Sequence, residues 1–190
     1  MLEWSVAALQ SVSSVEAIVI ALPAGYDGAG PAGTISVPGG AHRSLSVLAA
    51  LRAAAGDPVI VHDAARPLVR AEDVQAALDE LSRYDCDAVI AAVPVTDTIK
   101  EVTAGGIVAR TLDRSVLWAV QTPQVFRRTA LERALAAPDD VLAAATDDAW
   151  LVERDGGAVR VIASPPGNLK VTTPGDLRVA ELALRERAGT

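Results

Sequence analysis

Residues 58–67 run PVIVHDAARP, and this stretch decides how the fold is interpreted. Its first half, residues 58–62, is a short apolar segment typical of a buried strand. Asp63 follows directly, and ligands in open α/β sheets bind beyond the carboxyl ends of strands. A carboxylate there can hold Mg²⁺ by one oxygen while phosphates and water occupy the other positions. The alternative is that Asp63 caps the next turn and pairs with Arg66.

Strands and helices alternate on both sides of this stretch. Apolar runs predict strands at 15–22, 34–37, 58–62, 87–95 and 158–163, and helical patterns occur at 2–12, 42–55, 71–83, 127–137, 147–154 and 174–187. This alternation favours an α/β fold with a mostly parallel sheet, and the continuous apolar strands indicate helices on both faces. No linker or internal repeat divides the sequence, so residues 1–190 are interpreted as a single domain.

The region 97–121 departs from this alternation. Two β-like pieces, DTIKEV and GIVARTL, are joined by Ala104-Gly105-Gly106, which predicts a hairpin. A lone hairpin cannot bury both of its faces. We therefore expect a protruding β-hairpin arm that contacts a second copy of the chain.

The composition restricts the partners. The net charge is −7 with no basic cluster, which argues against a nucleic-acid partner. No apolar run reaches membrane-spanning length, and residues 1–14 lack a basic start to a signal peptide. With Cys86 as the single cysteine, a cytoplasmic location is the default expectation. Lys100 and Lys170 are the two lysines among 17 basic residues, and each marks a position where a compact ammonium could be required.

Two glycine-rich segments invite a phosphate-binding interpretation. Residues 28–33 match G-x-G-x-x-G, but TISVPGG follows instead of the helix that a dinucleotide site needs. Gly39 and Gly40 precede a predicted helix, where free N–H groups and the helix dipole could attract an anion, with Ser46 one turn inside. An ordinary turn and cap is an equally good interpretation of this second segment.

Lysine, arginine and threonine side chains complete the candidate site. Lys170 precedes the last helix, where a cation can neutralise charge that develops during nucleotidyl transfer. Thr173-Pro174 are expected as the N-cap and first residue of that helix. Arg114 could bind a phosphate with two hydrogen bonds, or pair with Asp113 or Asp97. Further candidates are Thr98, Thr122 and Thr146. His62, at the end of an apolar strand, is expected to be a hydrogen-bonded core residue.

Six segments together resemble the 2-C-methyl-D-erythritol 4-phosphate cytidylyltransferase family. They are GGAHRSLSV (39–47), VIVHDAARPLV (59–69), VPVTDTIKEV (93–102), TLDRSVLWAVQTPQVF (111–126), ATDDAWLVE (145–153) and NLKVTTPGDLRVAE (168–181). They occur in the family's order and cover most of the chain. The resemblance implies a Rossmann-like nucleotidyltransferase domain, with a β-arm that clasps a second subunit.

The resemblance also implies a reaction. CTP and 2-C-methyl-D-erythritol 4-phosphate would give CDP-methylerythritol and pyrophosphate with Mg²⁺, in non-mevalonate isoprenoid precursor synthesis. Carried over by position, Asp63 would hold the metal, and Gly40, Ser46 and Ala64 would bind the nucleotide. Residues implied for the methylerythritol phosphate are Lys170, Arg114, Thr98, Thr122 and Thr146, with Thr98 and Arg114 serving the partner's site.

The sequence also departs from the family pattern. Ala41 and Leu45 stand where some members carry acidic residues. The family opens with a strand and a Gly-rich loop bearing an Arg and a Lys, whereas this sequence starts at the helix that follows. We therefore expect a gap in the sheet, weak CTP binding and little activity. Two alternatives stay open: a cytidylyltransferase for another polyol phosphate such as ribitol 5-phosphate, and an inactive dimeric homologue.

Overall fold

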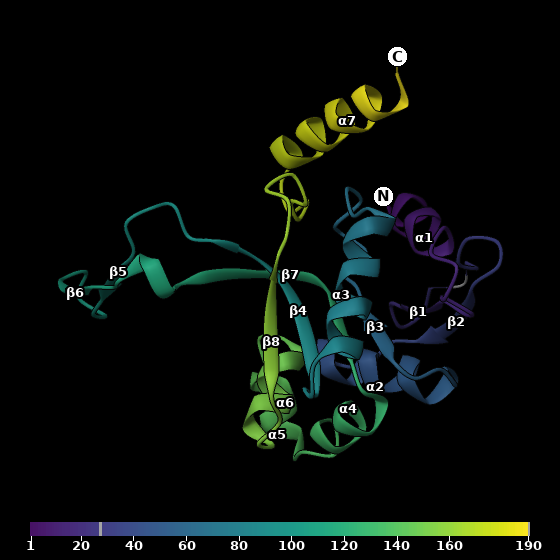
Figure 1. Cartoon of the computed structure of the whole chain (residues 1–190), viewed down its shortest axis with the longest axis horizontal. Helices are drawn as coiled ribbons and strands as arrows, with labels where there is room; N and C mark the ends of the chain where they lie inside the picture. Colours follow the sequence, from purple (N-terminus) through teal and green to yellow (C-terminus); the bar gives the residue numbers. More distant parts are fainter. Residues whose placement is uncertain (27, 190) are drawn as a thin grey trace.

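The computed structural model describes residues 1–26 and 28–189 (Figure 1). Its strands are β1 (Val19–Leu22), β2 (Ile35–Pro38), β3 (Val59–Val61), β4 (Ala88–Pro94), β5 (Lys100–Val102), β6 (Val108–Thr111), β7 (Trp118–Phe126) and β8 (Val159–Ala163). Its helices are α1 (Leu2–Gln10), α2 (Arg43–Ala53), α3 (Ala71–Arg83), α4 (Arg128–Ala134), α5 (Asp139–Ala144), α6 (Asp148–Arg154) and α7 (Pro174–Ala188), with a short 3₁₀ helix, η1, at Arg114–Val116. The predicted elements are all present: α3 has the predicted bounds, β2 is shifted by one residue, α7 ends one residue later, and the others are shorter than predicted.

The main sheet has four strands in the order β3-β7-β4-β8. Strand β7 runs antiparallel to both β3 and β4, and β4 runs parallel to β8. The expectation of a mostly parallel sheet is therefore corrected to an α/β fold with a mixed sheet. The longest strand, β7, was not predicted because Gln121, Thr122, Pro123 and Gln124 interrupt its apolar pattern.

Pro123 is tolerated within β7 because the β4–β7 pairing shifts register at this residue. Gln124 pairs with Ile90 and Val120 pairs with Ala92, so Pro123 lies at an irregularity where a ladder hydrogen bond is already lost. Next to this irregularity, Thr122 accepts hydrogen bonds from Asp63 and Asn168, in the loops that carry Asp63 and Lys170.

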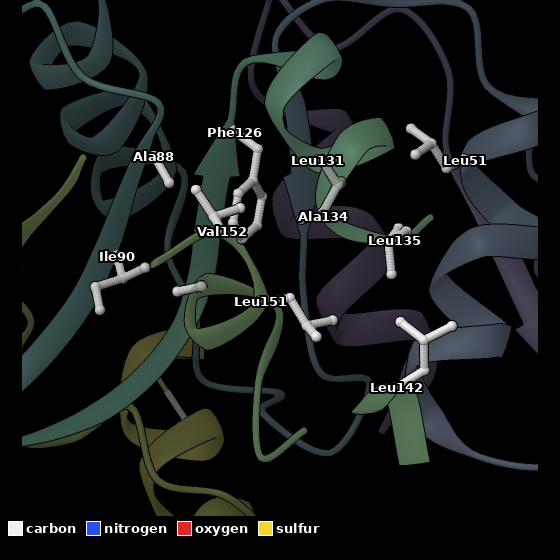
Figure 2. Packing of buried hydrophobic residues seen from close by; sticks show 11 residues of the cluster. Leu51, Ala88, Ile90, Phe126, Leu131, Ala134, Leu135, Leu142, Leu151 and Val152 are labelled. Atoms are coloured by element: carbon white, nitrogen blue, oxygen red, sulfur yellow. The ribbon is translucent and has the colours of Figure 1, made fainter. Parts of the chain in front are cut away.

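Helices cover both faces of the sheet, as expected. On one face, Ala88, Ile90 and Phe126 pack with residues of α2 and α4–α6 (Figure 2). On the other face, Val89 and Val125 pack against Ala77 and Leu81 of α3. These side chains are nearly or fully buried, and they fix the sheet between two apolar layers. Helix α5, which was not predicted, contributes Leu142 to the first layer.

Strands β1 and β2 form a separate parallel pair. The expected gap in the sheet is therefore confirmed among the described residues: β1 and β3 are not hydrogen-bonded to each other. A cavity of about 540 Å³ occupies this region, lined by residues 18–21 of the first pair, by residues 59–61 of β3 and by parts of α1 and α2. Its lining continues to Asp63 and Ala64.

Two segments extend away from this body in Figure 1. The β5–β6 hairpin, confirmed as an antiparallel pair, projects to one side, and α7 lies beyond the end of the sheet. Thr173 is the N-cap of helix α7, as predicted. Its hydroxyl accepts the Asp176 N–H, and the Asp176 carboxylate accepts the Thr173 N–H. Within residues 1–26 and 28–189, no helix is long and apolar enough to cross a bilayer.

Candidate active site

Asp63 and Lys170 meet at the end of β3. The Lys170 Nζ atom lies 2.9 Å from Asp63 Oδ2, although the two residues come from distant loops. Arg66 Nε lies 3.6 Å from the same oxygen, and Arg43 Nε lies 3.8 Å from Oδ1. The pairing with Arg66 that the sequence offered as an alternative is therefore present, but within a cluster of three cations around one carboxylate.

The surroundings keep Asp63 ionised. Burial opposes the charged carboxylate, but the hydrogen bond and charge of Lys170, with the charges of Arg43 and Arg66, outweigh it and lower the pKa of Asp63. The carboxylate is mostly buried, with 17% of the side chain exposed, while the Lys170 side chain is 45% exposed. An ionised carboxylate next to an exposed ammonium is suited to binding phosphates, because the carboxylate can hold a divalent cation that also binds the phosphate oxygens.

The loop after β8 is fixed by three hydrogen bonds, two to the Asp63 loop and one to β7. Asn168 Nδ2 donates to the Thr122 carbonyl at 2.8 Å, and Arg66 Nη1 donates to the Asn168 carbonyl at 2.8 Å. The Val171 N–H donates to the Ala65 carbonyl at 2.8 Å. Asn168 is 1% exposed, so these bonds form in a place from which water is excluded. They set the separation of Lys170 from Asp63.

Thr122 and His62 orient the backbone of Asp63. The Asp63 N–H donates to Thr122 Oγ1 at 3.0 Å. The Thr122 hydroxyl donates to His62 Nδ1 at 3.0 Å, because Nε2 of the neutral ring donates to the Arg66 carbonyl at 3.2 Å. Burial lowers the pKa of His62 to about 4, partly offset by this hydrogen bond and by the charge of Asp63. The prediction of a hydrogen-bonded core histidine is confirmed in part: both ring nitrogens are hydrogen-bonded, but the residue is only partly buried.

A second carboxylate lies behind Arg43. Asp148 is fully buried in the first turn of α6, and its Oδ2 lies 2.5 Å from Arg43 Nη1. Asp147, rather than Thr146, is the N-cap of α6, because its Oδ1 accepts the Trp150 N–H at 2.9 Å. From the sequence, Asp148 was noted only as one of the acidic residues beside Thr146, and neither Arg43 nor Asp148 was given a role. The only available signal was an acidic residue just inside a predicted helix, which is an ordinary surface pattern.

The segment of Gly39 and Gly40 differs from expectation. Its N–H groups are not free: Gly39 donates to the Leu22 carbonyl at 2.7 Å, and Gly40 donates to Ser46 Oγ at 3.1 Å. A Cβ atom at Gly40 would lie 2.3 Å from the Leu45 Cβ, so only glycine fits there. Ser46 lines the same cavity as Asp63 and Ala64. The segment thus brings a closely packed backbone, rather than unpaired donors, to the cavity.

The arm residues are not brought to this cluster within one chain. Arg114 and Thr98 are exposed, and Arg114 donates to the Thr96 carbonyl. Asp113 caps η1 by accepting the Ser115 N–H at 3.0 Å. Lys100, the other lysine, bonds Thr111 Oγ1 at 2.6 Å on the arm. Of the two lysines, Lys170 therefore lies beside Asp63 and Lys100 lies on the hairpin.

The site fits a divalent cation that is held partly by other ligands. In the described part of the chain, no three His, Cys, Asp or Glu side chains form a group that could hold a metal alone. Asp63 supplies one carboxylate, and its Oδ1 has Arg43 Nε only at 3.8 Å, beyond hydrogen-bond length. Mg²⁺ in nucleotide sites commonly takes one or two carboxylates, with phosphate oxygens and water as its other ligands.

Taken together, a mixed α/β sheet covered by helices, with acidic and basic side chains at one strand end, defines the class of α/β proteins with a strand-end ligand site. The chain belongs to the family described as IspD, 2-C-methyl-D-erythritol 4-phosphate cytidylyltransferase, whose model matches residues 1–186. The resemblance seen in the sequence motifs is thereby confirmed.

Individual relatives agree with this assignment. The chain is 53% identical over 162 residues to a 2-C-methyl-D-erythritol 4-phosphate cytidylyltransferase of Symbiobacterium thermophilum, covering 83% of this chain and 67% of that protein. It is 39% identical to a bifunctional enzyme IspD/IspF of Anaeromyxobacter dehalogenans, covering 100% of this chain and 51% of the relative. The chain thus spans about half to two thirds of the length of these curated relatives.

A solved structure shows the same arrangement of elements. The crystal structure of 2-C-methyl-D-erythritol 4-phosphate cytidylyltransferase from Thermus thermophilus superposes with a TM-score of 0.85 at 34% identity. The match covers 97% of this chain and 88% of the Thermus chain. This chain therefore has the α/β fold of that structure.

Proposed function

We propose that this chain carries a cytidylyltransferase site that joins CTP to 2-C-methyl-D-erythritol 4-phosphate and releases pyrophosphate. The observation that carries the proposal is the 2.9 Å pair of Asp63 and Lys170 at the end of β3. It brings together an exposed ammonium and a carboxylate, our proposed metal ligand, and phosphoryl chemistry needs these two charges close together. Membership of the IspD family supports the choice of both substrates.

On the nucleotide side, we assign Gly40, Ser46 and Ala64. Ser46 and Ala64 line the cavity that reaches Asp63, and Gly40 is joined to Ser46 because its N–H donates to Ser46 Oγ. Asp63 would hold Mg²⁺, which supplies charge neutralisation on the triphosphate when bound. Buried Thr122 and partly buried His62 keep Asp63 in place.

On the polyol phosphate side, Lys170 lies within the chain and Arg114 comes from the arm. Lys170 would neutralise charge as a phosphate oxygen of the polyol attacks the α-phosphorus of CTP and pyrophosphate leaves. Arg114 can bind a phosphate with two parallel hydrogen bonds. Thr98 is on the arm with Arg114, Thr122 is next to Asp63, and Thr146 is two residues before Asp148. We assign these threonines to the same substrate.

A homodimer completes this site. The arm exposes Ile107 and Val116 to 70% and 72%, and Val102, Val108, Trp118 and Val120 to between 41% and 52%. An exposed group of large apolar side chains on a projecting arm is typical of a protein–protein contact. A second copy that covers them would bring its own Thr98 and Arg114 towards Lys170, which accounts for their distance from Asp63 within one chain.

The proposal is tested with the full chain, CTP and Mg²⁺. CTP binding is measured by calorimetry, and pyrophosphate release is measured with 2-C-methyl-D-erythritol 4-phosphate or with ribitol 5-phosphate. We expect weak, metal-dependent CTP binding and slow pyrophosphate release with the methylerythritol substrate, both lost in Asp63→Asn and retained in the exposed control Asp139→Asn. Faster release with ribitol 5-phosphate would favour the other polyol phosphate, and absence of CTP binding would favour a non-catalytic dimeric module.

A further inference from the structure

Asp148 is an unusual group for the interior of this protein. It is 0% exposed, and its Oδ1 has no hydrogen-bond partner among the described residues. Its other oxygen contacts Arg43 Nη1 at 2.5 Å. A buried carboxylate is costly unless a cation compensates it, and replacement by apolar groups is often neutral or stabilising. Stability alone therefore gives little reason for an acidic residue at this position.

Arg43 connects Asp148 to Asp63. One end of its guanidinium binds Asp148, while Nε lies 3.8 Å from Asp63 Oδ1. The other two cations near Asp63 contact its Oδ2: Lys170 at 2.9 Å and Arg66 at 3.6 Å. Asp63 therefore has one oxygen in a close ion pair and one oxygen with only a distant cation.

Neutralising Asp148 should change the position of the Arg43 guanidinium. A guanidinium faced by two carboxylates divides its attraction between them, whereas one faced by a single carboxylate closes into a direct pair. Such a pair would occupy Asp63 Oδ1 and would compete with a divalent cation for it. The position of Arg43 is thus controlled from outside the ligand site.

We infer that Asp148 is a positioning residue, which draws the Arg43 guanidinium away from Asp63 and leaves Oδ1 for a divalent cation. The inference rests on the proposed role of Asp63 as the metal ligand. It assigns Asp148 no contact with metal, nucleotide or polyol phosphate. It also predicts a specific dependence between two substitutions, because Asp148 matters only while Arg43 is present.

The test is Mn²⁺ binding to the full chain, measured by the loss of the free Mn²⁺ signal in electron paramagnetic resonance. The variants are Asp148→Asn, Arg43→Gln and the double variant, with the exposed Asp139→Asn as the matched control. We expect Asp148→Asn to weaken Mn²⁺ binding about 10- to 100-fold, the range for outer partners of metal ligands. Arg43→Gln should bind Mn²⁺ at least as tightly as the unaltered chain, and the double variant should match Arg43→Gln.

The outcomes separate this inference from the proposed function. If Asp63→Asn binds Mn²⁺ as well as the unaltered chain, the metal role of Asp63 fails and the inference fails with it. If Asp63 is required but the double variant stays as weak as Asp148→Asn, Asp148 is structural and the inference alone is overturned. Should Asp148→Asn not fold, as judged by circular dichroism, the Arg43→Gln variant decides: weaker Mn²⁺ binding contradicts the inference.

Discussion

The Lys170 ammonium lies 2.9 Å from the Asp63 carboxylate, although one residue follows β3 and the other precedes α7. The sequence singles out these positions for separate reasons, one as a strand-end carboxylate and the other as a lone lysine in a loop. Their contact creates one place where a metal and a phosphate could be bound side by side. It also identifies which changes should impair the site.

Replacing Lys170 should reduce the rate of the proposed reaction more than it reduces nucleotide binding. Loss of a single group that stabilises developing charge costs about 10²–10³ in rate, and we expect a loss of this size in Lys170→Met. Lys170→Arg should recover only part of it, because a planar guanidinium does not replace a compact ammonium. Pyrophosphate release relative to the unaltered chain measures the effect. Lys100→Met, at the other lysine, is the control, and an equal loss there would contradict the assignment.

Replacing Asn168 should loosen the Lys170 loop. Asn168→Ala removes the buried hydrogen bond to the Thr122 carbonyl, and leaving that acceptor unsatisfied costs about 1–3 kcal/mol. Urea unfolding should show a loss of this size, whereas Gln75→Ala, at an exposed position of α3, should show almost none. If the free energy of unfolding fell no more in Asn168→Ala than in the control, the hydrogen bond from Asn168 to Thr122 would not contribute to stability.

The stability of the metal-free protein should depend on pH through His62. Its pKa is lowered from 6.5 to about 4, so between these values the unfolded chain binds a proton that the folded chain does not. Stability therefore rises with pH across this range and falls as the pH drops from 6.5 towards 4. The difference corresponds to roughly 3 kcal/mol. Denaturant titrations with a chelator present measure it, and His62→Gln should flatten the slope over this interval.

Introducing a charged side chain on the exposed apolar surface of the arm should prevent self-association. Val116 is 72% exposed in one chain, and an aspartate there would have to lose its water in any interface that covers the arm. Light scattering should give a dimer for the unaltered chain and a monomer for Val116→Asp. Ala76→Asp, an exposed change on α3, controls for added charge. A Val116→Asp protein that stays dimeric would place the interface elsewhere.

Much of the architecture could be predicted because local patterns and burial agree. Helix α3 buries Val74, Ala77 and Leu81 at helical spacing, and β4 is an apolar run covered on both faces. Strand β7 could not be predicted, since its polar centre serves the neighbouring loops instead of the core. Thr122 and Gln124 are buried there, with the Gln124 amide donating to Asp147 Oδ2 at 2.8 Å. The centre of β7 is therefore held by hydrogen bonds to distant residues, and its sequence lacks the apolar pattern by which a strand is predicted.

Residue types and their order along the chain were enough to identify the family, the α/β alternation, the hairpin, and Asp63 and Lys170 as candidates. The direction of β7, the internal bonding of Gly39 and Gly40, and the link from Asp63 through Arg43 to buried Asp148 could be found in the folded chain alone. Pairings of this kind depend on which distant segments meet and on how each buried charge is compensated. Neither leaves a periodic trace in the sequence.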